Sequence, residues 1–325
     1  MPADRALPIL RAPNAGVAQL VEQSLRKREV GGSSPSTGTS FLSWFTKRAF
    51  MKMHFSQLLA VLVFAFCVTG CARPSAEEQT DAVFTAYEKG DYQETLRLAR
   101  PLAEQGSAVE QYIVGILYQG GTGVAQDYAQ AASWFRKAAD QNYPEAQNNL
   151  GVMYLHGRGV PQDPVEAARW FQKAADLGKL EAQQNLANAY RTGQGVPKDD
   201  TEATKWFRKA AEQGDADAQY SLGYALHAGL GTPADHAEES AWFRKAAEQG
   251  HAQARINVGM TYFKGMGVPQ DYVQAHMWFN LAAASATDDD IRKQAATNRE
   301  SVQAAMTPAQ IADAQKMARE WQPGT

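Results

Sequence analysis

Apolar and small residues recur at steps of three and four over two stretches of residues 144–177, with polar residues between them. In the first stretch this spacing places Ala146 and Leu150 on one face, which predicts an amphipathic helix. Gly157 ends that helix, because glycine accepts the left-handed conformation that a helix C-terminus often needs. Pro164 suits the first turn of a second helix. The apolar face of that helix comprises Ala167, Trp170, Phe171, Ala174 and Ala175.

This helix pair repeats along the chain with a constant period. An aromatic pair, followed after two residues by two alanines, occurs five times, and its tryptophans lie 36 residues apart. Glycine pairs such as Gly157 and Gly159 keep the same period. A fixed period of about 20 to 50 residues is typical of stacked helical units. The sequence therefore predicts an all-α solenoid with five helix-turn-helix repeats over residues 108–286. The tryptophans are Trp134, Trp170, Trp206, Trp242 and Trp278.

These repeats resemble the Sel-one-like repeat family, a branch of the tetratricopeptide-like solenoids. The resemblance rests on the run A-Q-x-N-L-G-x-M-Y-x-x-G-x-G-V from Ala146 to Val160 and on the run W-F-x-K-A-A, and it covers about residues 80–321. It implies a superhelix whose first helices line the concave face. The copies depart at Ala187 in place of Gly, Leu226 in place of Tyr and Glu239 in place of Ala. We therefore expect the fourth repeat to be intact but slightly altered in packing.

Both ends of the repeat array lack the full pattern. Residues 81–107 contain two short apolar stripes separated by a turn at Gly90, with Leu98 and Ala99 where later copies have Trp-Phe. Such a degenerate unit is typical of a solenoid cap, because its outer face meets water. Residues 287–325 are predicted to form C-terminal capping helices. Their N-terminal signals are Asp288-Asp289-Asp290 and Thr307-Pro308-Ala309-Gln310.

Residues 1–50 show no coherent amphipathic period and include a polar run from Gly31 to Gly38. The stretch from Gly16 to Phe41 resembles the translated read-through of a transfer-RNA gene. We therefore expect synthesis to begin at Met51 or Met53. The alternative is an ordinary disordered N-terminal extension.

Residues 51–70 have the pattern of a lipoprotein signal peptide. The apolar run from Leu58 to Val68 has the length of a signal-peptide core and is too short for a stable spanning anchor. The sequence V-T-G-C that ends at Cys71 resembles the lipobox of bacterial lipoproteins. It implies a lipid on Cys71, a short tether over residues 71–80 and a periplasmic location. Ala72 implies sorting to the outer membrane by the same resemblance, whereas a core helix or an uncleaved signal anchor is the alternative.

Charge and cysteine content narrow the functional classes. The formal net charge is −3, and acidic residues outnumber basic ones after residue 70. The repeats therefore lack the basic surface that binds nucleic acid. Both cysteines, Cys67 and Cys71, precede the repeats, which excludes a disulfide framework or a cysteine metal site within them.

The repeats offer few signs of catalysis. Their histidines occupy different phases of the repeat, and no H-E-x-x-H pair occurs. The glycine pairs lack the strand–turn–helix setting of a nucleotide fingerprint, so we interpret them as turns. We expect no enzyme, no metal site and no cofactor. An envelope hydrolase acting on peptidoglycan or β-lactams is the alternative. The histidines are His156, His227, His236, His251 and His276.

The repeated aromatic and basic residues fit a structural role best. The tryptophans keep a fixed phase beside alanine, which favours a core between repeats over an aromatic binding row. The repeated lysines lie in the last turns of their helices, where a cation suits the helix dipole. A solvated face is therefore favoured over a basic ladder for an anionic glycan. These lysines are Lys137, Lys173, Lys209 and Lys245.

Two positions on the first helix of each repeat vary freely while their neighbours keep their residue type. The two positions are four residues apart and so share one stripe. Core positions must repeat if stacking repeats, so we predict that this stripe binds a partner; simple drift on an exposed surface is the alternative. We expect a membrane-anchored adaptor that holds an envelope protein or peptide in a concave groove, or alternatively a structural protein that contacts peptidoglycan. The stripe comprises Tyr112, Ile116, Asn148, Val152, Gln184, Asn188, Tyr220, Tyr224, Ile256 and Met260.

Overall fold

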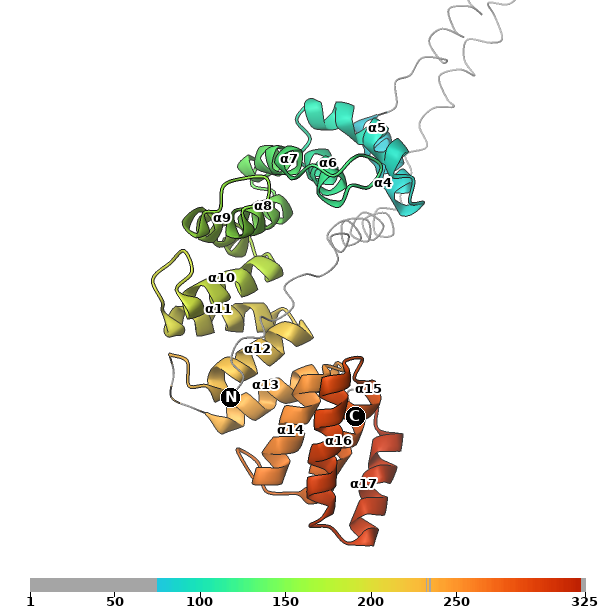
Figure 1. Ribbon diagram of the computed structural model, residues 1–325, viewed down its shortest axis with the longest axis vertical. Coiled ribbons are helices and arrows are strands. Elements are labelled where there is room, and N and C mark those ends of the chain that lie inside the picture. Colours follow the sequence, from blue (N-terminus) through green and yellow to red (C-terminus); the bar gives the residue numbers. More distant parts are fainter. Residues whose placement is uncertain (1–74, 232, 234, 323–325) are drawn as a thin grey trace, which may run out of the picture. The chain divides into compact units, whose positions relative to one another are not determined.

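The computed structural model describes residues 75–322, except residues 232 and 234, and this part of the chain is helical without strands (Figure 1). Its fourteen helices run from α4 to α17, which confirms the predicted all-α class. The chain divides into two compact units, residues 1–137 and 138–325, and the boundary falls inside α7 (Tyr128–Asp140). The expected signal peptide and Cys71, the expected site of lipid attachment, lie outside the described residues. Within the described residues, no helix has both the length and the apolar character required to cross a bilayer.

The first unit begins with a helix pair. Helix α4 (Ala76–Glu88) packs on α5 (Tyr92–Glu104), and α5 packs on α6 (Ala108–Gly120). Helix α4 begins inside the stretch expected to be a tether, because Ser75 and Glu78 form a capping box that starts a helix there.

From α8 to α16 each helix packs on the next along the chain, and the second helix of one repeat also contacts the first helix of the following repeat (Figure 1). Helix α9, for example, contacts both α8 and α10. The helices of the repeats are α8 (Pro144–His156), α9 (Pro164–Asp176), α10 (Leu180–Thr192), α11 (Asp200–Glu212), α12 (Ala216–His227), α13 (His236–Glu248), α14 (Ala252–Lys264) and α15 (Tyr272–Ser285).

Local signals set where these helices begin and end. The Asp163 side chain caps α9 by accepting hydrogen bonds from the backbone N–H groups of Val165 and Glu166. Gly157 ends α8 in the left-handed conformation, with φ of 66°, as the sequence predicted. The same aspartate cap begins the later second helices at Asp199, Asp235 and Asp271.

The core of each repeat depends on close approach between its two helices. A Cβ on Gly151 would lie 2.6 Å from the Phe171 ring, so only glycine lets α8 and α9 approach this closely without a shift. Gly223 and Phe243 repeat this contact in the fourth repeat. The tryptophans predicted as core are buried, except Trp242, which is half-buried.

Backbone and amide contacts join successive repeats. A Cβ on Gly195 would lie 1.9 Å from the carbonyl oxygen of Pro164, so the turn of the third repeat packs directly on the start of α9. Gln183 Nε2 donates a hydrogen bond of 3.2 Å to the carbonyl of Ala175 in the preceding helix. The same carbonyl also accepts a backbone hydrogen bond of 3.0 Å from Gly178, so the Gln183 side chain adds a second bond at the C-terminal end of α9.

Two helices follow the last repeat, as predicted. Helices α16 (Asp289–Gln303) and α17 (Pro308–Glu320) both pack on α15. Thr307 and Gln310 form the predicted capping box. The Trp321 ring lies edge-on to Trp278, with ring centroids 5.8 Å apart. This contact covers part of the apolar side of the last repeat.

Candidate functional site

The ten residues of the predicted partner-binding stripe lie in different environments. At the first position of each pair, Tyr112, Asn148 and Ile256 are buried, whereas Gln184 and Tyr220 are half-buried. In three of the five repeats this position is therefore closed to solvent.

The buried members of the stripe have packing partners inside the protein. The Tyr112 ring lies 5.7 Å from the Phe135 ring, centroid to centroid. Asn148 Oδ1 accepts a hydrogen bond of 2.9 Å from Asn185 Nδ2, which joins α8 to α10. Variation at these positions therefore reflects packing that differs from one repeat to the next.

The second position of each pair is more accessible in the middle repeats. Ile116 is buried, and Val152, Asn188 and Met260 are half-buried, whereas 51% of the Tyr224 surface is exposed. Met260 also packs against the cluster formed by α15 and α16.

An accessible part of the predicted stripe therefore remains on α8, α10 and α12. We call this set the open stripe, and partner binding by it stays a prediction. Tyr112, Ile116 and Ile256 are not accessible to a partner in this structure. The open stripe comprises Val152, Gln184, Asn188, Tyr220 and Tyr224.

Tyr220 marks the boundary between the open stripe and the core. Its ring stacks on the His251 imidazole at 4.4 Å and lies 5.7 Å from the Phe243 ring. Burial raises the pKa of the Tyr220 hydroxyl, and the neighbouring Tyr224 adds to this effect. Burial also lowers the pKa of His251, against the opposing effect of Asp217. Tyr220 therefore stays neutral and acts as a packing residue as well as a surface residue.

The repeated lysines cover the repeated tryptophans. The ammonium nitrogen of Lys173 lies 3.9 Å from the centre of the Trp170 ring, and that of Lys245 lies 3.6 Å from the Trp242 ring. An ammonium over an indole face is attracted by the ring quadrupole. These lysines are exposed, as the predicted solvated face requires, and each lysine also shields the edge of the core.

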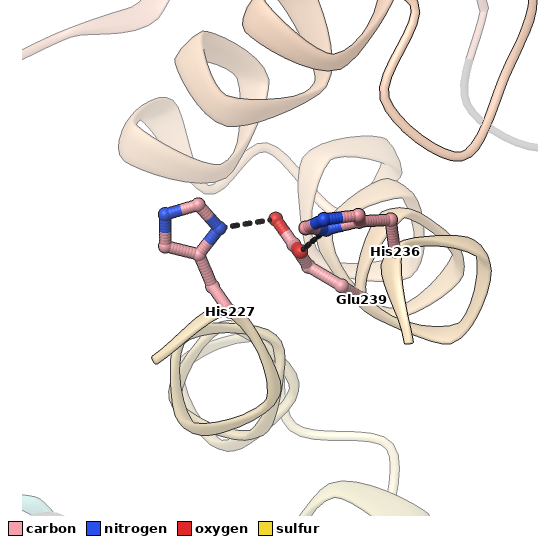
Figure 2. A group of neighbouring side chains, drawn as sticks. All are labelled: His227, His236 and Glu239. Atoms are coloured by element: carbon pink, nitrogen blue, oxygen red, sulfur yellow. Dashed lines mark hydrogen bonds and ion pairs between the residues drawn. The ribbon is translucent and has the colours of Figure 1, made fainter. Parts of the chain in front are cut away.

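The fourth repeat contains a cluster that sequence analysis missed. His227 ends α12, His236 begins α13, and Glu239 lies one turn further along α13 (Figure 2). One Glu239 oxygen lies 2.7 Å from His227 Nδ1, and the other lies 2.8 Å from His236 Nδ1. The carboxylate is buried, with 3% of its surface exposed, whereas both imidazoles are exposed.

The signal for this cluster was present in the sequence. Glu239 replaces an alanine that is fully buried in the other repeats, at Ala131, Ala167, Ala203 and Ala275. A carboxylate at a core position requires partners, because burying an isolated charge is costly. The histidines occupy different repeat phases, so a comparison of phases alone did not bring them together.

Stacked helix pairs of constant period, with an alanine and aromatic core and a partly accessible first-helix stripe, define a tetratricopeptide-like repeat protein. Sel1 repeats match residues 111–143, 144–179, 180–215, 216–251 and 252–286. The chain therefore belongs to the Sel1 repeat family, as its sequence resemblance indicated. Proteins of this family generally mediate protein–protein interaction and are generally not catalytic.

Two solved structures are similar to the chain. The protective antigen c5321 of uropathogenic Escherichia coli is 33% identical with a TM-score of 0.66, and the match covers 83% of this chain. The chain spans only 56% of the length of that protein. A Sel1 repeat protein from Oxalobacter formigenes is 27% identical with a TM-score of 0.61, and the match covers 73% of this chain and 98% of that protein. No curated protein matches the chain in a sequence search.

Proposed function

We propose that this protein is a membrane-anchored adaptor of the bacterial envelope that binds a partner protein or peptide through the open stripe. The observation that carries the proposal is the exposure of Tyr224 among residues that vary within an otherwise repeating first helix. Tyrosine offers a large, rigid contact with a polar tip, and asparagine and glutamine offer adaptable hydrogen bonds. An extended peptide or a protein surface of mixed polarity fits this chemistry.

The proposed anchor is a lipid on Cys71, and it is supported by the sequence of residues 51–71 alone. Covalent lipid provides membrane affinity through buried methylenes, and several acyl chains make the attachment durable. The adaptor would then be confined to the membrane surface, so that its effective concentration toward other envelope proteins is high. The lipobox resemblance and Ala72 also support a periplasmic location at the outer membrane.

Crosslinking and affinity capture from intact envelopes test partner binding. Wild type is compared with Tyr224→Glu and with Val165→Glu, because Val165 is exposed to a similar extent on a second helix. We expect one protein to be captured by wild type and Val165→Glu and lost with Tyr224→Glu, while all three show the same helical circular dichroism. Equal capture by all three contradicts the open stripe, and retention on purified peptidoglycan alone favours the cell-wall contact protein.

Metabolic labelling with a fatty acid tests the anchor separately. Label should enter the wild-type protein and be lost with Cys71→Ser. A soluble, unlabelled wild-type protein would contradict the anchor and leave the result on the open stripe unaffected.

A further inference from the structure

The geometry points to a binding site for a divalent transition-metal ion, best fitted to Zn²⁺, formed by His227, His236 and Glu239. Each residue offers one ligand atom, and these atoms lie within 4.8 Å of one another. Figure 2 shows both imidazoles directed at the two oxygens of one carboxylate. The site belongs to the fourth repeat alone and is separate from the open stripe as defined above.

The distances are close to those that a metal ion requires. Zn²⁺ binds imidazole nitrogen and carboxylate oxygen at about 2.0–2.2 Å, so tetrahedral ligands lie about 3.4 Å apart. The present Nδ1–oxygen separations are 2.7 and 2.8 Å, the length of hydrogen bonds. These separations are shorter than the tetrahedral spacing by roughly 0.6–0.7 Å, and all three ligand atoms lie within 4.8 Å of one another, so side-chain shifts on the order of 1 Å would bring them into a tetrahedral arrangement. Both histidines are exposed at the ends of their helices, which leaves them free to make this movement.

The buried carboxylate gives the site its affinity for a cation. Glu239 lies at a core position, and the structure records His227 and His236 as its ion-pair partners. When both imidazoles are neutral, they offer dipoles but no positive charge. A bound dication supplies that charge, and buried charges in proteins are commonly paired or coordinated to metals.

The ligand set selects the class of ion. Two imidazoles and one carboxylate suit Zn²⁺ and related transition ions, whereas Mg²⁺ and Ca²⁺ prefer shells of oxygen. Three protein ligands leave a fourth tetrahedral position for water. Because both histidines are exposed, an ion can enter from solvent without unfolding the repeat.

The repeat pattern indicates that this arrangement is additional to the scaffold. Alanine stands at the Glu239 position in the four other repeats, and the His227 position holds Gln119, Leu155, Arg191 and Phe263 there. Stacking therefore requires neither the carboxylate nor the imidazoles. A metal bound here would join the end of α12 to the start of α13.

Equilibrium dialysis of the full chain against Zn²⁺, with metal analysis, tests the site. The protein carries no histidine tag and is first treated with a chelator. We expect one Zn²⁺ per chain and a Zn²⁺-dependent rise in Tm, because an ion that binds only the folded state stabilises it. Co²⁺ should give the visible absorption of a four-coordinate site, and Mg²⁺ at equal concentration should produce no rise in Tm.

Glu239→Ala is the most informative variant, because it restores the alanine of the other repeats and should fold normally. We expect its Zn²⁺ affinity to fall by at least about 10- to 100-fold, the range seen when even an outer-shell partner is removed. His227→Gln and His236→Gln should each do the same and change only exposed side chains. His156→Gln, at an exposed histidine of the second repeat, is the matched control and should keep wild-type affinity.

Two results would overturn the site. One is a wild-type protein that binds less than one Zn²⁺ per chain at concentrations where His-rich zinc sites are filled. The other is a wild-type stoichiometry that persists unchanged in Glu239→Ala and in both glutamine variants, because the ion would then bind elsewhere.

Discussion

The second and fourth repeats share a core and differ at one side of it. In both, a first-helix glycine packs against a phenylalanine ring so closely that an added Cβ would lie 2.6 Å from the Phe171 ring at Gly151 and 2.7 Å from the Phe243 ring at Gly223. In the second repeat Ala167 is fully buried, whereas in the fourth Glu239 occupies that position and binds two histidines. The scaffold therefore depends on the glycine–phenylalanine contact and tolerates a carboxylate nearby when that group has partners.

The largest expected effect tests whether the two cores are equivalent. Phe171→Ala and Phe243→Ala should each lower the free energy of unfolding by about 3–5 kcal/mol, because both rings are almost completely buried. Urea denaturation followed by circular dichroism measures the difference. A cost below about 1 kcal/mol for Phe243→Ala alone would show that the fourth repeat does not share the core of the second.

The next prediction concerns the carboxylate that distinguishes the fourth repeat. Replacing His227 and His236 together by alanine should destabilise the protein by about 1–3 kcal/mol, because Glu239 is left buried without partners. Adding Glu239→Ala to this double variant should recover most of that loss. Urea unfolding in the presence of a chelator measures both effects, and a triple variant no more stable than the double would contradict the interpretation.

A pH-dependent difference should also separate the two repeats. His251 accepts a hydrogen bond from the backbone N–H of Ala254 at the start of α14, and burial lowers its pKa. The unfolded state then binds the proton more readily, so this contribution to stability is present near neutral pH and decreases as pH falls through the unfolded pKa. Lys179 occupies the corresponding place after the second repeat and pairs with Glu145 and Glu181.

His251→Asn keeps a capping oxygen and removes the titrating ring. We expect the loss of stability between neutral pH and about pH 5 to be smaller in this variant than in wild type. Denaturation curves over that range measure it. If the pH dependence of stability is unchanged in this variant, the loss of stability at lower pH arises from other groups. One such group is His276, whose pKa is also lowered by burial.

The smallest expected effect compares the two lysine–tryptophan contacts. Lys173→Met and Lys245→Met should each cost about 0.5–1 kcal/mol, the usual size of an exposed cation–π contact. The effect at Lys245 should be the smaller of the two, because Trp242 is only half-buried and its indole N–H also donates to Glu238. Thermal unfolding at low and high salt measures both effects. Stabilities identical to wild type would show that these contacts do not contribute to the stability of the fold.

The period and the residue types predicted the helices, their order and the core, because each of these depends on local spacing. Exposure along the stripe could not be predicted in the same way. Asn148 varies from its counterparts and is nevertheless buried, since Asn185 in the next repeat supplies its hydrogen bond. A position whose residue type varies between repeats therefore either lies on an exposed surface or packs against a different neighbour in each repeat. Only the packing in the structure distinguishes these two cases. The histidine cluster was not predicted, because its residues come together across the turn between two helices. Helical spacing relates only residues of the same helix.

The contact between Gly195 and the carbonyl of Pro164 has a consequence for how such an array can change length. Here the turn of one repeat packs directly on the backbone of the preceding repeat. No side chain lies between them that could rearrange to accommodate an added residue. An insertion in that turn would move Gly195 away from Pro164 and would disturb the packing of two repeats at once. Duplication or loss of a whole repeat preserves every such backbone contact, so the array can change length in steps of one period. Single-residue insertions in these turns are disfavoured.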